Sequence, residues 1–428
     1  MVYATLDTPK IAPHALSVRQ LAAVVAGNAL EFYDFLTFSF FTVQIGHTFF
    51  PGQDEDTKIL STLAIFGVGF LTRPLGAYVI GRWGDRAGRK PAMFLSFTLM
   101  GIAILGLSLT PSRAAIGIAA PILFLLFRLL QGFALGGEVG PTTAYLLEIA
   151  PPERRGFFVS LQFMTQDFAV LVAGVVGFLL SDYLDPGALD SWGWRIAFLI
   201  GAGVVPFGLI VRRSLPETFS HPTPEKTRAR TPGLWRLALL GGVMLATVTI
   251  TNYTIDYMTT FAENTLNIST RVAFGATVMI GFWATVFDLV SGSVTDRFGR
   301  KPVMIASGFV FLALVLPIFY AVITLKSTAA LLIGSALLGT LQGLYAPPIL
   351  IGVTEGLPRE IRSGALALVY AIAISTFGGS TQFIVKGLIK LTGNPFAPAG
   401  FMTAALAFAV VAMFFVRETA PVKTGDLS

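Results

Sequence analysis

The sequence predicts an all-α integral membrane protein with twelve transmembrane helices, arranged as two pseudo-symmetric bundles of six. Three observations lead to this fold class: an apolar composition, evenly spaced apolar segments and an internal repeat. Hydrophobic residues make up 54% of the 428 residues and charged residues only 13%, whereas an ordinary soluble domain carries about 25% charged residues. Because so few charges cannot cover a soluble surface of this size, we expect a lipid environment.

Apolar segments of membrane-spanning length recur along the chain. A helix needs about 20 apolar residues to cross a hydrocarbon layer of ~30 Å, and only helices or closed barrels satisfy their backbone there. The segments lack the period-two alternation of barrel strands, so helices are predicted. The predicted spans are 18–44, 57–80, 92–110, 115–148, 155–181, 194–211, 234–262, 270–291, 303–324, 328–354, 363–390 and 397–416.

The first apolar segment and a polar stretch in the middle of the chain complete the predicted organisation. The first apolar segment is too long for a signal-peptide core and lacks a small-residue cleavage site, so we expect a retained helix. The only long polar stretch, 212–232, contains four prolines and reads as a linker. We therefore expect residues 1–211 to form one six-helix half, 212–232 a cytoplasmic linker, and 233–428 the second six-helix half.

The charge distribution predicts an orientation. Most of the 30 Lys and Arg residues fall on one side if both termini are cytoplasmic, as the positive-inside rule requires. The net charge of +6 is therefore a topology signal and predicts no nucleic-acid partner. We expect a multi-pass protein of a bacterial inner membrane, with the lipid bilayer as its surroundings and a monomer as its state.

The sequence contains no residue pattern that predicts an enzyme. The absence of cysteine excludes disulfides and thiolate catalysis, and the three histidines, His14, His47 and His221, lie outside the expected bundle centre. No HExxH motif or nucleotide-binding loop occurs, so neither a catalytic residue, a metal site nor a cofactor is predicted. A membrane sensor is a further alternative, but no signalling domain is recognisable.

A ten-residue segment occurs twice. GRWGDRAGRK at 81–90 returns as GSVTDRFGRK at 292–301, and Leu-Gln-Gly at 130–132 returns at 341–343 with the same offset of 211 residues. A structural unit present twice is typical of alternating-access transporters. Both copies fall in short cytoplasmic loops, where glycines allow a tight turn and the charges can pair. A basic loop that only sets orientation is the simpler alternative. The predicted cytoplasmic gate consists of Asp85, Arg86, Gly88 and Arg89 in the first copy and Asp296, Arg297 and Arg300 in the second.

Ionisable residues within the spans are candidate functional residues, because a charge costs several kcal/mol in a bilayer unless it is paired. Arg128 offers a planar fork that suits a substrate carboxylate, while Glu31 and Asp34 can carry protons. An ion pair between Arg128 and Glu138 that only holds the first half together is the alternative.

The complete set of predicted site residues follows from depth and helical face. The predicted substrate-binding residues are Asn28, Arg128, Gln131, Gln162, Gln166, Gln342, Tyr345 and Tyr370, and the predicted proton-coupling residues are Glu31, Asp34, Glu138 and Asp167. Gln162 and Gln166 could instead join helices, and Tyr345 and Tyr370 could pack in the core. Outside this set, Asn252 and Asp256 are expected at an external gate, Lys386 near the outer surface, and Arg73 at a helix bend before Pro74.

Several longer motifs resemble one family. The repeated segment is similar to the signature of the major facilitator superfamily. GNALEFYDF (27–35), RLLQGFALGGE (128–138) and WGWRIAFLIGA (192–202) resemble its metabolite–proton symporters. HTFFP, TEGLPREIRSGALALVYAIAISTFGG and LTGNPFAPAGF look most like the citrate and tricarballylate members.

The resemblance implies a symporter that imports a small organic anion with protons, driven by the proton gradient and without a cofactor. A proton-coupled osmolyte symporter for proline or betaine is the alternative, because that branch shares the first-helix and Arg128–Glu138 signatures. Asp167 departs from the tricarboxylate members, in which this position is usually neutral. An added central carboxylate opposes a trivalent anion unless it is protonated, which leaves a smaller acid or a zwitterion open.

Overall fold

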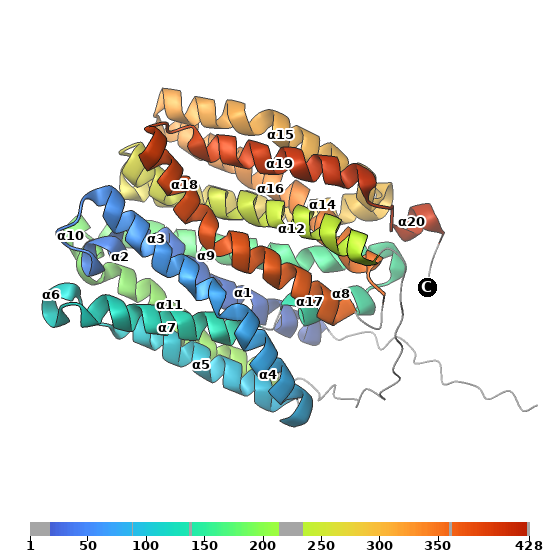
Figure 1. Cartoon of the computed structure of the whole chain (residues 1–428), viewed down its shortest axis with the longest axis horizontal. Coiled ribbons are helices and arrows are strands. Elements are labelled where there is room, and N and C mark those ends of the chain that lie inside the picture. Colours follow the sequence, from blue (N-terminus) through green and yellow to red (C-terminus); the bar gives the residue numbers. More distant parts are fainter. Residues whose placement is uncertain (1–17, 88, 137–138, 214–233, 359–361, 426–428) are drawn as a thin grey trace, which may run out of the picture.

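A computed structural model describes residues 18–87, 89–136, 139–213, 234–358 and 362–425. These residues form a bundle of long helices joined by short connections, and the long helices run roughly along one common direction (Figure 1). The fold class predicted from the sequence is confirmed, because a helix occupies each of the twelve predicted spans. Several spans are divided into two or three consecutive helical pieces.

The first part of the chain contains the first six predicted spans. In chain order its elements are α1 (Val18–Phe40), α2 (Thr42–Phe49), α3 (Glu55–Leu71), α4 (Arg73–Ala87), α5 (Arg89–Leu109), α6 (Arg113–Ile116), α7 (Ala119–Leu135), α8 (Val139–Ile149), η1 (Pro152–Arg154), α9 (Arg155–Tyr183), α10 (Pro186–Ala188), η2 (Leu189–Gly193) and α11 (Trp194–Arg213).

The second part contains the other six. Its elements are α12 (Leu234–Asp256), α13 (Met258–Thr260), η3 (Phe261–Thr265), α14 (Thr270–Phe298), α15 (Arg300–Leu325), α16 (Thr328–Gly356), α17 (Arg362–Ala373), η4 (Ile374–Gly378), α18 (Gly379–Thr392), α19 (Ala397–Phe415) and α20 (Pro421–Thr424).

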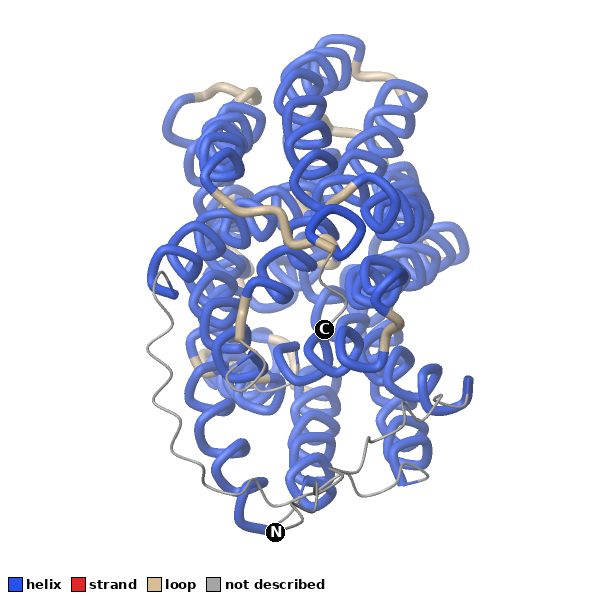
Figure 2. Tube along the Cα trace, turned by 90° about the vertical axis from the view of Figure 1, so that its right-hand side faces the viewer, coloured by secondary structure: helices blue, strands red, loops and turns tan. Residues whose placement is uncertain are grey.

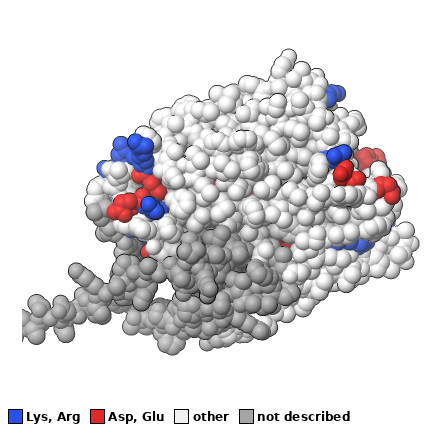
Figure 3. Space-filling view, turned by 180° about the vertical axis from the view of Figure 1, so that it is seen from behind, with Lys and Arg blue, Asp and Glu red and all other residues white. Residues whose placement is uncertain are grey.

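The surface of the bundle is consistent with a bilayer. Within the described residues, eight helices are long and apolar enough to cross a membrane, and Phe94–Leu109 and Ala119–Leu135 are shorter apolar helices. One face of the molecule shows Lys, Arg, Asp and Glu gathered toward its two ends, with a broad uncharged region between them (Figure 3). This uncharged region matches the hydrocarbon layer that the composition predicts.

Two of the breaks in the spans lie close to the centre of the molecule. The second span breaks at Thr72, just before Arg73 and Pro74, because proline lacks a backbone N–H and fits best in the first turn of a new helix. The eleventh span contains a π-helical turn, η4, and such turns often occur at functional sites.

Small residues bring the first and second parts of the chain into contact. A β-carbon at Gly174 of α9 would lie 2.9 Å from the backbone nitrogen of Val278 in α14. On the other side, a β-carbon at Gly67 of α3 would lie 2.6 Å from the carbonyl oxygen of Gly379. Figure 2, seen roughly along the helices, shows them packed side by side and joined by short loops. Close glycine contacts of this kind let helix backbones pack tightly in a membrane.

The structure of the second repeated segment (292–301) explains why a glycine is needed at position 299. Gly299 joins α14 to α15 with φ +102°, a conformation that side-chain-bearing residues rarely adopt. The corresponding Gly88 lies outside the described residues. The division of the chain at residues 212–232 remains a prediction, since that segment also lies outside them.

Candidate functional site

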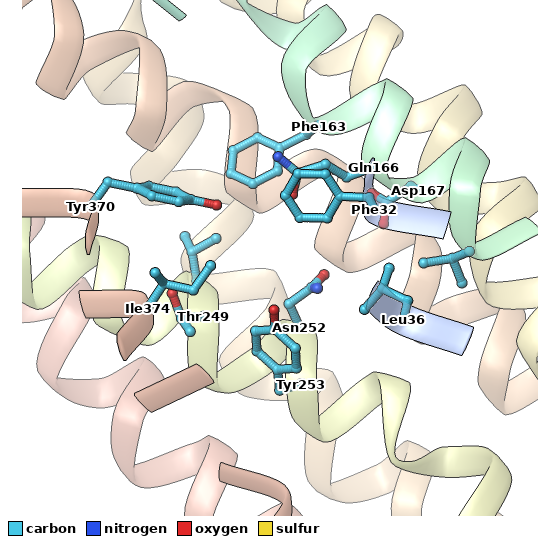
Figure 4. Close-up of a pocket in the computed structure, with 12 residues that line it drawn as sticks. Phe32, Leu36, Phe163, Gln166, Asp167, Thr249, Asn252, Tyr253, Tyr370 and Ile374 are labelled. Carbon is cyan, nitrogen blue, oxygen red and sulfur yellow. The ribbon is translucent and has the colours of Figure 1, made fainter. Parts of the chain in front are cut away.

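A small cavity lies between the first and second parts of the chain, near the middle of the bundle. Side chains from α1, α9, α12, α17 and η4 converge on it (Figure 4). Its volume is about 20 Å³, which is room for a single water molecule. Its lining residues are Phe32, Leu36, Phe163, Gln166, Asp167, Val170, Val248, Thr249, Asn252, Tyr253, Tyr370 and Ile374. Any organic substrate therefore requires the two parts to move apart.

Arg128 is completely buried in α7 and belongs to a chain of polar contacts. Its guanidinium donates a hydrogen bond to Gln131, and the amide nitrogen of Gln131 donates to Asp34 of α1. The sequence prediction placed these three residues in one site, and they do lie together. The Nε and Nη2 groups of Arg128 have no hydrogen-bond partner among the described residues. Buried polar groups are normally satisfied, so these donors are candidates for a ligand.

Aromatic rings surround this guanidinium. Its Cζ lies 4.0 Å from the ring centroid of Phe35, 4.5 Å from that of Phe38 and 4.8 Å from that of Phe66. Desolvated cation–π contacts of this kind are worth about 2 kcal/mol or more. They stabilise the charge without occupying the free donors.

Arg73 is a second central cation, which the sequence analysis placed only at a helix bend. It does start α4 after the break, but its Cζ lies 4.2 Å from the ring centroid of Phe35 and 4.4 Å from that of Phe70. Phe35 therefore contacts both guanidiniums. Arg73 acts electrostatically on Tyr253 and on Arg128, so two positive charges lie close together.

An aromatic contact separates these cations from the cavity. Phe70 packs edge-on against Tyr253 with ring centroids 5.5 Å apart, and Tyr253 lines the cavity. Neither arginine is among the lining residues. Displacement of Phe70 and Tyr253 would open a route from the cavity to the guanidiniums.

Asn28 and Gln162 contact each other within the first part of the chain. The Gln162 amide donates to Asn28 Oδ1 at 2.9 Å, and Asn28 donates to the Gln162 carbonyl oxygen and to Thr165 Oγ1 at 3.2 and 2.6 Å. These bonds join α1 to α9. In this conformation the pair fits the alternative role of joining helices.

Gln166 and Tyr370 face the cavity from the two parts of the chain. Both side chains line it, as Figure 4 shows. Asp167 also lines it and is buried. The sequence analysis selected all three residues for the site, and in the structure all three line the same cavity.

Gln342 and Tyr345 lie on α16, away from the cavity lining. The Gln342 amide is 3.4 Å from the Val248 carbonyl oxygen, and its Oε1 has no partner among the described residues. Tyr345 is fully buried and packs edge-on against Phe311, with ring centroids 5.7 Å apart. Tyr345 therefore sits in the core, which was its alternative role.

Some predicted residues cannot be placed. The structure describes Glu31, Asp85, Arg86 and Arg89 only as positions in their helices, without their side-chain surroundings. Glu138 and Gly88 lie outside the described residues altogether.

Ion pairs join the two parts at the end predicted to be external, where α2 and α18 lie. Lys386 is 2% exposed and pairs with Asp56 at 2.5 Å and with Asn264. Lys386 lies near this end, as expected, but its ammonium group is enclosed by Asp56 of α3 and Asn264 of η3 and is not exposed. Lys390 adds a more exposed pair with Asp54 at 3.3 Å.

His47 connects two carboxylates at the same end. Its Nδ1 lies 2.9 Å from Asp190 and its Nε2 lies 2.8 Å from Glu55. The hydrogen bond with Asp190 is the largest effect, and it raises the pKa of His47 above the usual value despite partial burial. A raised pKa means that the protonated form is the one stabilised by folding.

This geometry predicts a pH-dependent contribution to stability. Because the pKa of folded His47 exceeds the unfolded value of about 6.5, its contribution is complete below that value and is lost as the pH rises through the folded pKa. We expect His47→Gln to flatten the dependence of melting temperature on pH above about pH 6.5. Thermal unfolding of purified protein measures this, and parallel curves for parent and variant would contradict it.

At the end predicted to be cytoplasmic, Asp296 of the second repeated segment contacts the other half of the chain. Its carboxylate accepts from the backbone nitrogens of Gly156 and Phe157 in the first turn of α9, at 2.7 and 2.9 Å. A carboxylate at this position satisfies free N–H groups and complements the helix dipole.

Arg300 holds this carboxylate in place. It donates to Asp296 at 2.9 Å and forms a two-pronged pair with Glu355 at 3.0 and 2.9 Å. Arg297, the third predicted gate residue of this copy, borders a groove with Glu153 and Arg154 on the same end. The second copy therefore has the contacts that a gate needs.

The arrangement defines a class of protein. A multi-pass helical bundle with buried charges near its centre and ion pairs at both ends, formed by a sequence that contains an internal repeat, is the architecture of a membrane transporter. Comparisons with known proteins agree with this class.

A family model described as "sugar (and other) transporter" matches the chain twice, over residues 20–231 and 221–426. The chain belongs to this transporter family of the major facilitator superfamily. It is 36% identical to a citrate-proton symporter of Klebsiella pneumoniae over 93% of this chain and 91% of the relative. It is also 33% identical to the alpha-ketoglutarate permease of Escherichia coli (strain K12), over 86% and 88%.

More distant comparisons agree on the fold. A proline/betaine transporter of Salmonella typhimurium is 30% identical over 94% of this chain and 84% of the relative. The crystal structure of a D-xylose-proton symporter superposes with a TM-score of 0.76, at 19% identity over 94% of this chain and 98% of that chain. The structural likeness concerns the fold alone.

Proposed function

We propose that this protein is a symporter that imports citrate or a related di- or tricarboxylate together with protons, by alternating access. The similarity to citrate-proton symporters supports the reaction. The main structural support for an anionic substrate is Arg128, a buried guanidinium with two N–H groups unpartnered among the described residues. A substrate carboxylate is the natural partner for this fork.

The electrostatics of the centre favour an anion. Arg73 and Arg128 lie close together, and Asp34 is the carboxylate that reaches Arg128, through Gln131. A carboxylate bound between the guanidiniums would reduce the repulsion between them. Protonation of Asp34 on the same hydrogen-bonded chain would change the charge that the substrate meets, which couples the proton to the substrate.

The remaining site residues take supporting roles in this proposal. Gln166 and Tyr370 line the closed cavity and become available to the substrate when the halves separate. Asp296 and Arg300 close one end, and Lys386 closes the other. We further propose that the protein is a monomer in a bacterial inner membrane, with both termini cytoplasmic and two halves at 1–211 and 233–428.

An osmolyte symporter for betaine or proline is the second candidate, and one feature favours it. The aromatic side chains of Phe32, Phe163, Tyr253 and Tyr370 line the cavity beside Asp167, and aromatic surroundings suit a quaternary ammonium group. Proline/betaine transporters are also among the relatives.

Uptake into proteoliposomes separates the candidates. Labelled citrate, tricarballylate, succinate and betaine are offered with and without a proton gradient. We expect accumulation of a carboxylate only with the gradient. Uptake that ignores the gradient would refute symport, and uptake of betaine alone would refute the organic-acid substrate.

A further inference from the structure

Asp288 is a buried carboxylate that the sequence analysis did not select. It lies on α14, is 0% exposed, and interacts through its side chain with Asp167 on α9. Neither of its oxygens accepts a hydrogen bond from an N–H or O–H group of the described residues. Its one polar partner among those residues is therefore another carboxyl group, from the other half of the chain.

The surroundings provide no positive charge for this pair. Asp256 at the end of α12 acts electrostatically on Asp167 and is itself a carboxylate, which accepts from Asn252 at 3.3 Å. In the described part of the chain, no Lys or Arg forms an ion pair with Asp167, Asp256 or Asp288. The local charge is therefore negative when the carboxyl groups are ionised.

Other titratable groups on the packed helices lie further off. On α14, Asp296 is eight residues from Asp288, about 12 Å along the helix. The other ionisable side chains described on the neighbouring elements are Tyr33 and Asp34 on α1, Arg155, Asp182 and Tyr183 on α9, Arg236 and Tyr253 on α12, Glu263 on η3, Arg271 and Arg297 on α14, and Tyr345 and Glu355 on α16. None of them donates a hydrogen bond to Asp288.

Chemistry limits what such a pair can be. Two ionised carboxylates in contact repel each other strongly in an apolar interior, so carboxyl pairs of this kind share a proton. One group then donates an O–H···O hydrogen bond to the other. The backbones on either side of the pair are held close. A β-carbon at Gly281 of α14 would overlap the backbone of Leu171 in α9, and a β-carbon at Gly292 would overlap Ser160. The contact is therefore part of the closed interface.

We propose that Asp167 and Asp288 hold one proton between them when the halves are closed, and that this shared proton is one that the transporter carries. When the halves separate on the outer side, both groups meet water and the pair takes up one proton from it. When they separate on the inner side, the pair returns that proton to water and both groups ionise. This inference extends the proposed symport. It depends on the proposed function for the identity of the substrate, but not for the existence of the shared proton.

Asp288→Asn tests the transport consequence. The amide keeps a donor for Asp167 and so preserves the closed contact, but it removes the site that binds and releases the shared proton. We expect citrate exchange between preloaded and external pools to continue, while accumulation driven by a pH gradient falls. One coupled proton supports about tenfold accumulation per pH unit, so the loss is about tenfold.

Asp182→Asn is the matched control, because Asp182 is a carboxylate on the same helix as Asp167 but pairs with Arg271 at 3.1 Å. It should leave both exchange and accumulation unchanged. Full accumulation by Asp288→Asn, with the same number of protons per substrate as the parent, would overturn the proposal.

A second measurement does not need the substrate. Infrared spectra of the reconstituted protein at neutral pH should contain a C=O stretching band from a protonated buried carboxyl group. The double variant Asp167→Asn/Asp288→Asn should lose about one carboxyl equivalent of this band, and Asp182→Asn should not. An unchanged band in the double variant would overturn the proposal even if citrate proves to be the wrong substrate.

Discussion

Replacing Arg128 with alanine is expected to abolish citrate binding in the purified transporter. The side chain provides the free guanidinium donors at the centre, and loss of one partner of a buried charge pair costs about 3 kcal/mol, or more than 100-fold in Kd. Arg128→Lys should also bind weakly, because a lysine keeps the charge but lacks the planar fork. Protection of the protein against heat or labelling by citrate measures the affinity.

Two further variants separate a binding role from a structural one. Arg236→Ala removes an exposed arginine on α12 and should bind like the parent. Arg128→Ala removes the cation that Asp34 reaches through Gln131. The double variant Arg128→Ala/Asp34→Asn restores the charge balance, so it should fold better without recovering affinity for citrate. Recovery of citrate binding in the double variant, or an unchanged Kd in Arg128→Ala, would show that Arg128 is structural.

Replacing Gly132 with alanine is expected to prevent correct packing of the first half. A β-carbon on Gly132 of α7 would overlap the carbonyl oxygen of Gly69 in α3, and neither backbone can move without displacing Arg128, which lies along the same face. Overpacking typically costs 1–3 kcal/mol, and occasionally more. We expect little folded protein on size-exclusion chromatography and the lowest melting temperature of the series.

The internal repeat provides a graded control for this prediction. Gly343 is the equivalent of Gly132, and its β-carbon would lie 2.7 Å from the carbonyl oxygen of Ala284, so Gly343→Ala should be less severe. Gly387 on α18 has nothing within 4 Å, and Gly387→Ala should melt like the parent. Equal stability of all three variants would mean that α3 and α7 do not approach as closely as described.

The fold was predictable because its signals are local. Apolar segments of fixed length, and a repeat with a constant offset, depend only on distances along the chain. The divisions within the spans were harder to predict from the sequence. The sequence analysis predicted 115–148 as one helix, but Gly117 adopts φ +61° and the regular helix α7 begins only at Ala119. A single glycine gives no reliable sign of such a break.

The site was predictable only where one helix presents its residues on one face. Arg128 and Gln131 are three residues apart, and Gln166 and Asp167 follow from depth along α9. Arg73 and Asp288 were missed because their importance comes from neighbours on other helices. Arg73 has the rings of Phe35 and Phe70, and Asp288 has Asp167. Spacing within one segment contains no information about such partners.

Asn252 shows the same limit in another form. The sequence analysis placed it with Asp256 at an external gate, whereas it lines the central cavity. The predicted span 234–262 nearly matches the observed Leu234–Thr265. The error lies in the position of the cavity along the span, which span boundaries do not give.

The two ends of the bundle are closed by contacts that differ in their response to salt. Lys390 and Asp54 are exposed ion-pair partners, with 38% and 64% of their side chains accessible, and exposed charges are screened over about 10 Å at 0.1 M salt. Asp296 is only 10% exposed and holds two backbone N–H groups. Ionic strength should therefore loosen the outer closure more than the inner one. Ser39 at the end of α1 is 0% exposed and donates to Gln382 of α18 at 2.9 Å. Because the chain contains no cysteine, the labelling rate of Ser39→Cys at increasing salt would measure how far the outer end opens.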